Sequence, residues 1–126
     1  MKRTYVTIDG DDIGRRIASY YLADDDAGLS RFSAQLSSAV TSITEMLKSR
    51  GFSILFSAAD GVTACGEDPV DYSIIFNQLA HYQFSGITYS MGIGSNLREA
   101  YVALLAAKSN GKACSFSYSM LTEARM

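Results

Sequence analysis

The sequence predicts a mixed α/β (α+β) fold in which a mainly antiparallel sheet is covered by helices largely on one face. Three observations support this prediction. Short β-branched and aromatic runs alternate along the chain with longer segments of helical periodicity. Two of the short runs are separated only by residues 57–61, a spacing suited to a β-hairpin. One long segment repeats apolar residues at steps of three and four, which is typical of a helix packed against a sheet.

The composition is that of a globular protein, because 48% of the 126 residues are hydrophobic and 19% are charged. We expect residues 1–126 to form a single domain. The formal net charge of −2 argues against a broad basic face, so no binding to duplex nucleic acid is expected. No stretch approaches the ~18 apolar residues that span a bilayer, which predicts a cytoplasmic protein without membrane contact. Cys65 and Cys114 are too isolated to indicate a disulfide framework or a zinc site.

The N-terminal half contains one predicted strand and two predicted helices. Residues 4–8 form the strand, which ends in a polar turn, and residues 13–22 form a short helix with Asp12 or a neighbour as its N-cap. A second, long amphipathic helix ends at Gly51. The apolar residues that define this helix are Phe32, Leu36, Val40, Ile43 and Leu47.

A hairpin and a third helix follow. Residues 52–56 and 62–65 predict the two hairpin strands, with Asp60 at the tip between them. Pro69 is expected at the first position of the next helix, and Asp71 in its first turn.

The C-terminal part predicts another strand and another helix. Residues 87–93 alternate as a strand does, and Asn96 and Glu99 have capping-box-like spacing for a helix over 97–109. Gly111 ends that helix, and the tail over residues 112–120 can add an edge strand. This order of elements is ferredoxin-like in outline.

This arrangement brings two carboxylates together. If the first strand and the hairpin are neighbours in the sheet, Asp9 at the end of one and Asp60 at the tip of the other converge. Mg²⁺ (or Mn²⁺) is commonly held by one or two carboxylates together with substrate phosphates. The sequence therefore predicts a divalent-cation site that uses Asp9 and Asp60.

Basic residues and backbone amides near this site can bind phosphate. Lys108 and Lys112 are four positions apart and share a face if the helix continues through Gly111, so they can hold the outer phosphates of a nucleoside triphosphate. The lysines also favour a helix C-terminus on dipole grounds alone, and aspartates commonly cap helices and turns. The backbone N–H groups that open the first helix offer a further anion site, formed by Asp11, Asp12, Ile13 and Gly14.

Three motifs resemble those of a known family. They are residues 7–14 (TIDGDDIG), the turn 57–61 (SAADG), and the strand 89–94 (YSMGIG) followed by the helix end 106–112 (AAKSNGK). In this order they resemble the palm domain shared by GGDEF diguanylate cyclases and CRISPR-associated polymerases. The similarity is greatest to the stand-alone minimal CRISPR polymerase family (mCpol), and it extends over almost the whole chain. It implies a ferredoxin-like palm domain.

The resemblance implies a role for individual residues. Asp9 resembles the metal ligand of the first strand, and Gly10 resembles the residue whose carbonyl completes that site. Asp60 occupies the metal-binding third position of the GGDEF-type turn, so Asp9 and Asp60 are the expected catalytic residues. Lys108 and Lys112 resemble the two residues that grip the triphosphate, with lysine in place of the usual arginine at the second.

The sequence also departs from the family pattern. Ala58 and Ala59 replace the paired glycines of the turn, and Gly61 stands where a second acidic ligand is usual. Asp11 is the expected substitute ligand, with Asp12 behind it.

A further departure concerns the base. Ile17 aligns with the asparagine that reads guanine in diguanylate cyclases, and an isoleucine cannot make that hydrogen bond. Guanine specificity is therefore not supported, which leaves adenine open, and the resemblance implies ATP as the favoured substrate. The resemblance implies a nucleotidyltransferase that makes a cyclic di- or oligonucleotide by two-metal phosphoryl transfer, in antiviral (anti-phage) signalling. A homodimer is expected, because one palm of this size holds one triphosphate and a cyclic dinucleotide needs two.

Three other functions stay open. A receiver-type phospho-acceptor module also has an acidic pair, a lone aspartate and a late lysine, although a strand returning directly after Asp60 argues against it. The same palm resembles the archaeal GTP cyclohydrolase III, which hydrolyses its nucleotide. A catalytically silent nucleotide-binding palm is consistent with the missing glycines.

Overall fold

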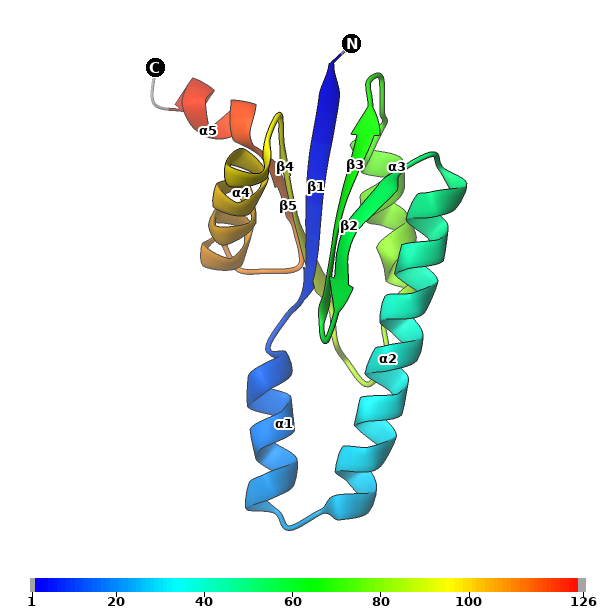
Figure 1. The fold of residues 1–126 in the computed structure, drawn as a ribbon. Helices are drawn as coiled ribbons and strands as arrows, with labels where there is room; N and C mark the ends of the chain where they lie inside the picture. Colours follow the sequence, from blue (N-terminus) through cyan, green and yellow to red (C-terminus); the bar gives the residue numbers. More distant parts are fainter. Residues whose placement is uncertain (1, 125–126) are drawn as a thin grey trace.

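The computed structural model describes residues 2–124 and contains a five-stranded sheet with the strand order β2-β3-β1-β4-β5 (Figure 1). The strands are β1 (Arg3–Gly10), β2 (Ser53–Ala58), β3 (Gly61–Glu67), β4 (Tyr89–Gly94) and β5 (Ser115–Ser117). The helices are α1 (Ile13–Leu22), α2 (Asp26–Ser49), α3 (Tyr72–Gln78), the 3₁₀ helix η1 (Leu79–Tyr82), α4 (Leu97–Ser109) and α5 (Tyr118–Ala124). None of the helices within residues 2–124 has the length and apolar character needed to cross a bilayer.

The predicted mixed fold with a mainly antiparallel sheet is confirmed. Strand β1 pairs antiparallel with β3 on one side and β4 on the other, and β2 pairs antiparallel with β3. The two connections that bridge parallel strands run through α2 and α3, which completes the ferredoxin-like β-α-β-β-α-β core. Among the strands within residues 2–124, only β5 pairs in parallel, with β4.

The core lies between one face of the sheet and helices α2 and α3. Val6 and Ile8 of β1 are buried on this face, and Phe32 and Leu47 of α2 pack against it together with Ile75 of α3. The apolar stripe predicted along the long helix is confirmed, since all five of its defining residues are buried. Alternation along β1 then directs Thr7 and Asp9 to the opposite face.

Helix α4 lies against that opposite face, unlike α2 and α3. Gly92 of β4 pairs with Thr7, and a Cβ atom added to Gly92 would lie 2.1 Å from the carbonyl oxygen of Ala100. Gly94 is similarly close to the backbone of α4. The absence of side chains at these two glycines lets the helix approach the strand closely. The helices of the ferredoxin-like core therefore share one face, and the added α4-β5 unit covers part of the other.

Several predicted boundaries differ from the observed ones. Helix α3 begins at Tyr72 rather than at Pro69, because the carboxylate of Asp71 caps it by accepting a hydrogen bond from the N–H of Ile74. Strand β4 begins at Tyr89 rather than at residue 87. The tail contributes a strand as predicted, but only over Ser115–Ser117, and it continues as the unpredicted helix α5.

One end of the sheet gathers the loops that carry the predicted site. Figure 1 shows α1 and the N-terminal half of α2 extending beyond this end of the strands. Strand β1 ends here, the tight β2-β3 turn lies here, and β4 and β5 begin here. The fold therefore brings four segments that are distant in the sequence to one edge of the sheet.

Candidate active site

The sheet places Asp9 and Asp60 beside each other. Asp9 lies opposite Gly61 in the β1-β3 pairing, and the N–H of Gly10 donates a hydrogen bond of 3.0 Å to the carbonyl oxygen of Asp60. Burial raises the pKa of Asp9 above its ordinary value, and the negative charge of Asp60 adds to the rise. The pair therefore forms a negatively charged site that favours a cation.

Lys108 reaches this site from the last turn of α4. Its Nζ lies 2.9 Å from the carbonyl oxygen of Gly10, 3.2 Å from Oδ2 of Asp9 and 2.8 Å from Oδ1 of Asp11. Burial by itself would lower the pKa of Lys108, but the hydrogen bond to Asp11 and the charges of both aspartates outweigh it and raise the pKa. An ammonium group therefore lies among three oxygens at the end of β1.

Asp11 is buried, with 4% of its surface exposed. Its carboxylate accepts hydrogen bonds from Ser90, Thr88 and Lys108 and from the backbone N–H of Ala113. Burial favours the neutral acid, yet these four donors outweigh burial and lower the pKa of Asp11 below its ordinary value. Asp11 is thus an ionised carboxylate in contact with three other segments of the chain.

Lys112 contacts the site from the loop after α4, and not from the helix itself as predicted. Helix α4 ends at Ser109 instead of continuing through Gly111, so Lys108 and Lys112 do not share a helical face. Lys112 lies in the following loop, and its Nζ binds the carboxylate of Asp12. This hydrogen bond lowers the pKa of Asp12. Both lysines nonetheless lie beside the end of β1, because each contacts an aspartate there.

The start of α1 supplies part of the predicted anion site. The N–H of Asp11 is already used, since it donates a hydrogen bond of 2.9 Å to the carbonyl oxygen of Thr88. The N–H groups of Ile13 and Gly14 lie in the first turn of α1, where no preceding helical carbonyl accepts them, and Asp12 is the N-cap. Any anion at this helix end is therefore limited to Asp12, Ile13 and Gly14.

The loops around the site hold unusual backbone conformations. Six residues other than glycine within residues 2–124 have positive φ angles, and four of the six lie around the site. Each such conformation costs about 1–3 kcal/mol, so the surrounding contacts must stabilise it. The four are Asp12, Ala59, Lys112 and Ala113. At Ala59 the turn adopts a left-handed conformation although the residue is not glycine.

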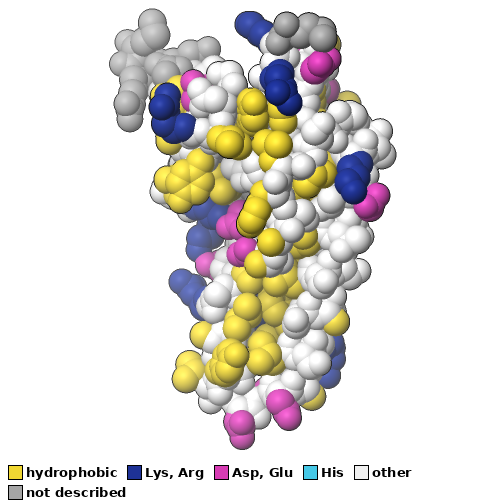
Figure 2. Space-filling model, in the orientation of Figure 1, with side chains coloured by type: hydrophobic (Ala, Val, Ile, Leu, Met, Phe, Trp, Pro, Cys, Tyr) yellow, Lys and Arg dark blue, Asp and Glu magenta, His cyan; other side chains and the backbone are white. Residues whose placement is uncertain are grey.

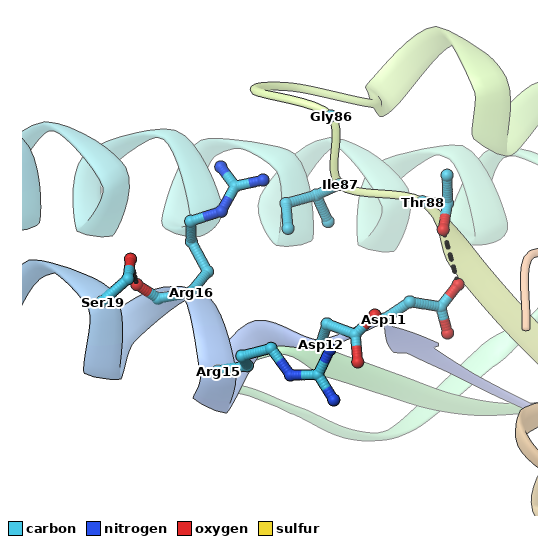
Figure 3. Close-up of a pocket in the computed structure, with 8 residues that line it drawn as sticks. All are labelled: Asp11, Asp12, Arg15, Arg16, Ser19, Gly86, Ile87 and Thr88. Carbon is cyan, nitrogen blue, oxygen red and sulfur yellow. Dashed lines mark hydrogen bonds between the residues drawn. The ribbon is translucent and has the colours of Figure 1, made fainter.

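A cavity of about 340 Å³ lies behind Asp11, between α1 and residues 86–88 (Figure 3). Arg15 and Arg16 line it from α1, and the hydroxyl of Thr88 donates a hydrogen bond of 2.7 Å to Asp11 at its edge. The guanidinium of Arg16 lies 5.7 Å from the ring centroid of Phe32. The sequence did not predict this cavity, because it forms only where α1 meets the loop before β4.

Sequence reasoning also missed the groups that hold Asp11. Ser90 belongs to the predicted strand motif, but nothing in the motif indicated that its hydroxyl points toward Asp11. Thr88 and the N–H of Ala113 carried no sequence signal, because they lie 77 and 102 positions from Asp11.

The donor set is compatible with a divalent cation. No group of three or more His, Cys, Asp or Glu side chains within the described residues is arranged as a metal site. Two carboxylates and a backbone carbonyl are nevertheless the hard oxygen ligands that Mg²⁺ takes together with substrate phosphates. The ammonium of Lys108 contacts two of these groups, Asp9 and the Gly10 carbonyl.

The surface around this position carries charged side chains beside hydrophobic ones. Figure 2 shows acidic and basic side chains side by side at mid-height, near the end of the strands, with hydrophobic side chains above and below them. The charged groups are therefore accessible from this side of the molecule. A ligand with both phosphates and an apolar ring system matches such a surface.

The sequence profile of the minimal CRISPR polymerase domain, mCpol, matches residues 5–118. The chain belongs to the minimal CRISPR polymerase family. This mCpol chain accordingly carries a palm domain of the nucleotide cyclase/polymerase type, as its motifs predicted. A search of curated protein sequences finds no match.

Solved structures of GGDEF-type domains share the fold. The active GGEEF domain of a diguanylate cyclase from Vibrio cholerae superposes with a TM-score of 0.61 at 14% identity, covering 94% of this chain and 83% of that one. The GGDEF domain of DgcB from Caulobacter crescentus, solved with c-di-GMP, gives 0.64 at 14% identity, covering 94% and 78%. An EAL/GGDEF domain protein from M. capsulatus gives 0.60 at 17% identity, covering 93% and 84%. At these identities the likeness establishes the fold alone.

Proposed function

We propose that this mCpol protein is a nucleotidyltransferase that joins nucleoside triphosphates, with ATP favoured, into a cyclic di- or oligonucleotide and releases pyrophosphate. The observation that carries the proposal is the convergence of Asp9, Asp60, the Gly10 carbonyl and Lys108 at one end of the sheet. Membership of a cyclase/polymerase-type family supports the same reaction class.

The proposed chemistry assigns a role to each group. Asp9, Asp60 and the Gly10 carbonyl would hold Mg²⁺ or Mn²⁺, which supplies charge neutralisation at the reacting phosphates and lowers the pKa of an attacking hydroxyl. Lys108 and Lys112 are expected to bind and orient the triphosphate, because ammonium groups pair strongly with phosphate. Phosphoryl transfer depends mainly on positioning and charge, so this site needs no serine or histidine nucleophile.

Ile17 gives no support for a preference for guanine, which leaves ATP open as the substrate. This residue is half-buried on α1 and offers no hydrogen-bonding group to guanine. A base held at this helix would be recognised by apolar contact, which does not favour guanine over adenine.

A homodimer belongs to the same proposal. Closing a cyclic dinucleotide requires a second nucleotide in line with the first α-phosphate, and a second copy facing the first across a two-fold axis would hold it. We expect the edges that carry Asp9, Gly10 and Asp60 to face each other. Specific activity should then rise with protein concentration through the dimerisation range.

The proposed biological setting follows from the family alone. A single-domain palm over residues 1–126, acting in the cytoplasm, would make a cyclic nucleotide signal in antiviral (anti-phage) defence. The family name supports this setting only by analogy.

The deciding experiment is incubation of the protein with each nucleoside triphosphate and Mg²⁺ or Mn²⁺, followed by mass spectrometry. A cyclic product from ATP, lost in Asp9→Asn and in Asp60→Asn while circular dichroism shows an intact fold, is the expected result. These substitutions remove a metal ligand without changing side-chain volume, so a folding defect is not expected. Near-wild-type turnover in either variant would refute the metal assignment.

The same assay separates the alternatives. A ring-opened nucleotide from GTP would indicate a hydrolase that resembles GTP cyclohydrolase III. Binding without any product would indicate a catalytically silent palm.

A further inference from the structure

Asp11 lies at the centre of the hydrogen-bond network around the site. Its donors come from three places: residues 88 and 90 at the start of β4, Lys108 on α4, and Ala113 in the loop before β5. These partners lie between 77 and 102 positions away in the sequence. One buried side chain therefore ties together the segments that carry both lysines.

The carboxylate has no acceptor position left for a metal. Oδ1 accepts hydrogen bonds from Ser90 at 2.7 Å and from Lys108 at 2.8 Å. Oδ2 accepts from Thr88 at 2.7 Å and from the N–H of Ala113 at 3.0 Å. An ionised carboxylate offers about four lone-pair positions, and all four are used here. A cation bound to Asp11 would have to displace one of these donors, of which the Ser90 hydroxyl is fully buried.

We propose that Asp11 is a positioning residue, which holds Lys108 and the loop of Lys112 in place for the triphosphate, rather than a ligand of the catalytic metal. This inference rests on the proposed function. It replaces the metal-ligand role that the sequence indicated for Asp11.

The physical basis is the flexibility of lysine. A lysine side chain has several rotatable bonds, so an unrestrained ammonium loses conformational freedom when it binds phosphate. Asp11 restrains Nζ of Lys108 in advance, beside the Gly10 carbonyl and within reach of the site. Its bond to the N–H of Ala113 also fixes the residue next to Lys112, where the backbone is in the left-handed region. Preorganisation of this kind raises affinity by lowering the entropy cost of binding.

The test is a double-mutant cycle on triphosphate binding. Calorimetry measures the affinity for a non-hydrolysable ATP analogue in wild type, Asp11→Asn, Lys108→Ala and the double variant. Each single substitution should weaken binding about 10- to 100-fold, the range of a charge-assisted hydrogen bond. If Asp11 acts through Lys108, adding Asp11→Asn to Lys108→Ala should cost much less than it costs in wild type.

A second readout separates positioning from metal ligation. The affinity for Mn²⁺ alone, measured from the free-ion electron paramagnetic resonance signal, should persist in Asp11→Asn and fall in Asp60→Asn. Additive losses of analogue affinity, or a loss of Mn²⁺ affinity in Asp11→Asn equal to that in Asp60→Asn, would overturn the inference. A folded wild type that binds no triphosphate would instead refute the proposed function itself.

Two further variants complete the design. Asp24→Asn removes the same charge from an exposed turn after α1 and should leave both affinities unchanged. If circular dichroism shows that Asp11→Asn is unfolded, Thr88→Val takes its place in the cycle, since it removes one donor to Asp11 and keeps the charge. Thr88→Val should weaken analogue binding in wild type but not in Lys108→Ala, and an equal loss in both backgrounds would contradict the positioning role.

Discussion

Gly92→Ala is the substitution that tests most directly how the fold positions this site. Gly92 lies in the middle of β4, where α4 crosses the strand closely. A Cβ atom there would lie 2.1 Å from the carbonyl oxygen of Ala100 and 2.3 Å from the backbone nitrogen of Leu104. Both obstacles are backbone atoms of α4, so no side-chain rotation can relieve the contact.

The expected cost follows from this geometry. Cβ contacts shorter than 3.0 Å are essentially never observed, so α4 must move away from β4 by roughly 1 Å. Overpacking of a well-packed contact costs about 1–3 kcal/mol, and we expect the upper part of this range because a whole helix must shift. Lys108 would move with α4 and lose its present hydrogen bonds to Gly10 and Asp11. Triphosphate affinity should therefore fall together with stability.

Urea denaturation followed by circular dichroism measures the change in unfolding free energy. Gly14→Ala is the matched control, because a Cβ at Gly14, in α1, meets no atom within 4 Å. That control should be stabilised by about 0.5–1 kcal/mol, the usual gain for replacing glycine in a helix. A neutral surface substitution changes the unfolding free energy by at most about 0.5 kcal/mol. If the unfolding free energy of Gly92→Ala differs from that of wild type by no more than this, the close approach of α4 to β4 is refuted.

Two further predictions concern the charged groups. Lys112→Ala should weaken binding of a triphosphate more at low than at high salt, because screening reduces the contribution of an exposed charge. Calorimetry at two ionic strengths measures this difference, and equal losses of affinity at both would contradict the prediction. The pKa of Asp11 in the folded protein lies below its ordinary value of 3.8, so its stabilising contribution is complete above that pH and is lost as the pH falls through the folded-state pKa. The difference in unfolding free energy between wild type and Asp11→Asn should thus be constant near neutral pH and shrink below about pH 3.8; a difference that grows in acid would contradict the lowered pKa.

The sequence by itself determined the local elements of this protein. Helix α4 spans the predicted residues 97–109, and Asn96 caps it by accepting a hydrogen bond from the N–H of Glu99, as the spacing of the two residues indicated. The same holds for α1, which spans the predicted residues 13–22. Such signals lie within a few positions of the feature that they define, so they can be recognised without knowledge of the rest of the chain.

The convergence of Asp9 and Asp60 was also predictable, because it needed only one assumption, that β1 pairs with the hairpin. The pairing of Asp9 with Gly61 confirms that assumption. By contrast, the sequence predicted that α3 begins at Pro69. Pro69 and Asp71 are both typical of a helix N-terminus, and the sequence does not decide between them. The structure selects Asp71 as the cap, since its carboxylate reaches the N–H of Ile74.

Only the tertiary structure decided how Asp11 is used. From the sequence, Asp9 and Asp11 are both aspartates at the end of one strand, and either can be a metal ligand. The chain leaves β1 after Gly10, so Asp9 keeps a side chain 32% exposed at the strand end, whereas that of Asp11, 3% exposed, is enclosed among four donors. These donors come from residues 77 to 102 positions away, and no local pattern encodes such contacts. The local signals set which segments form strands and helices, whereas packing of distant segments determines which carboxylate faces a ligand and which one is buried.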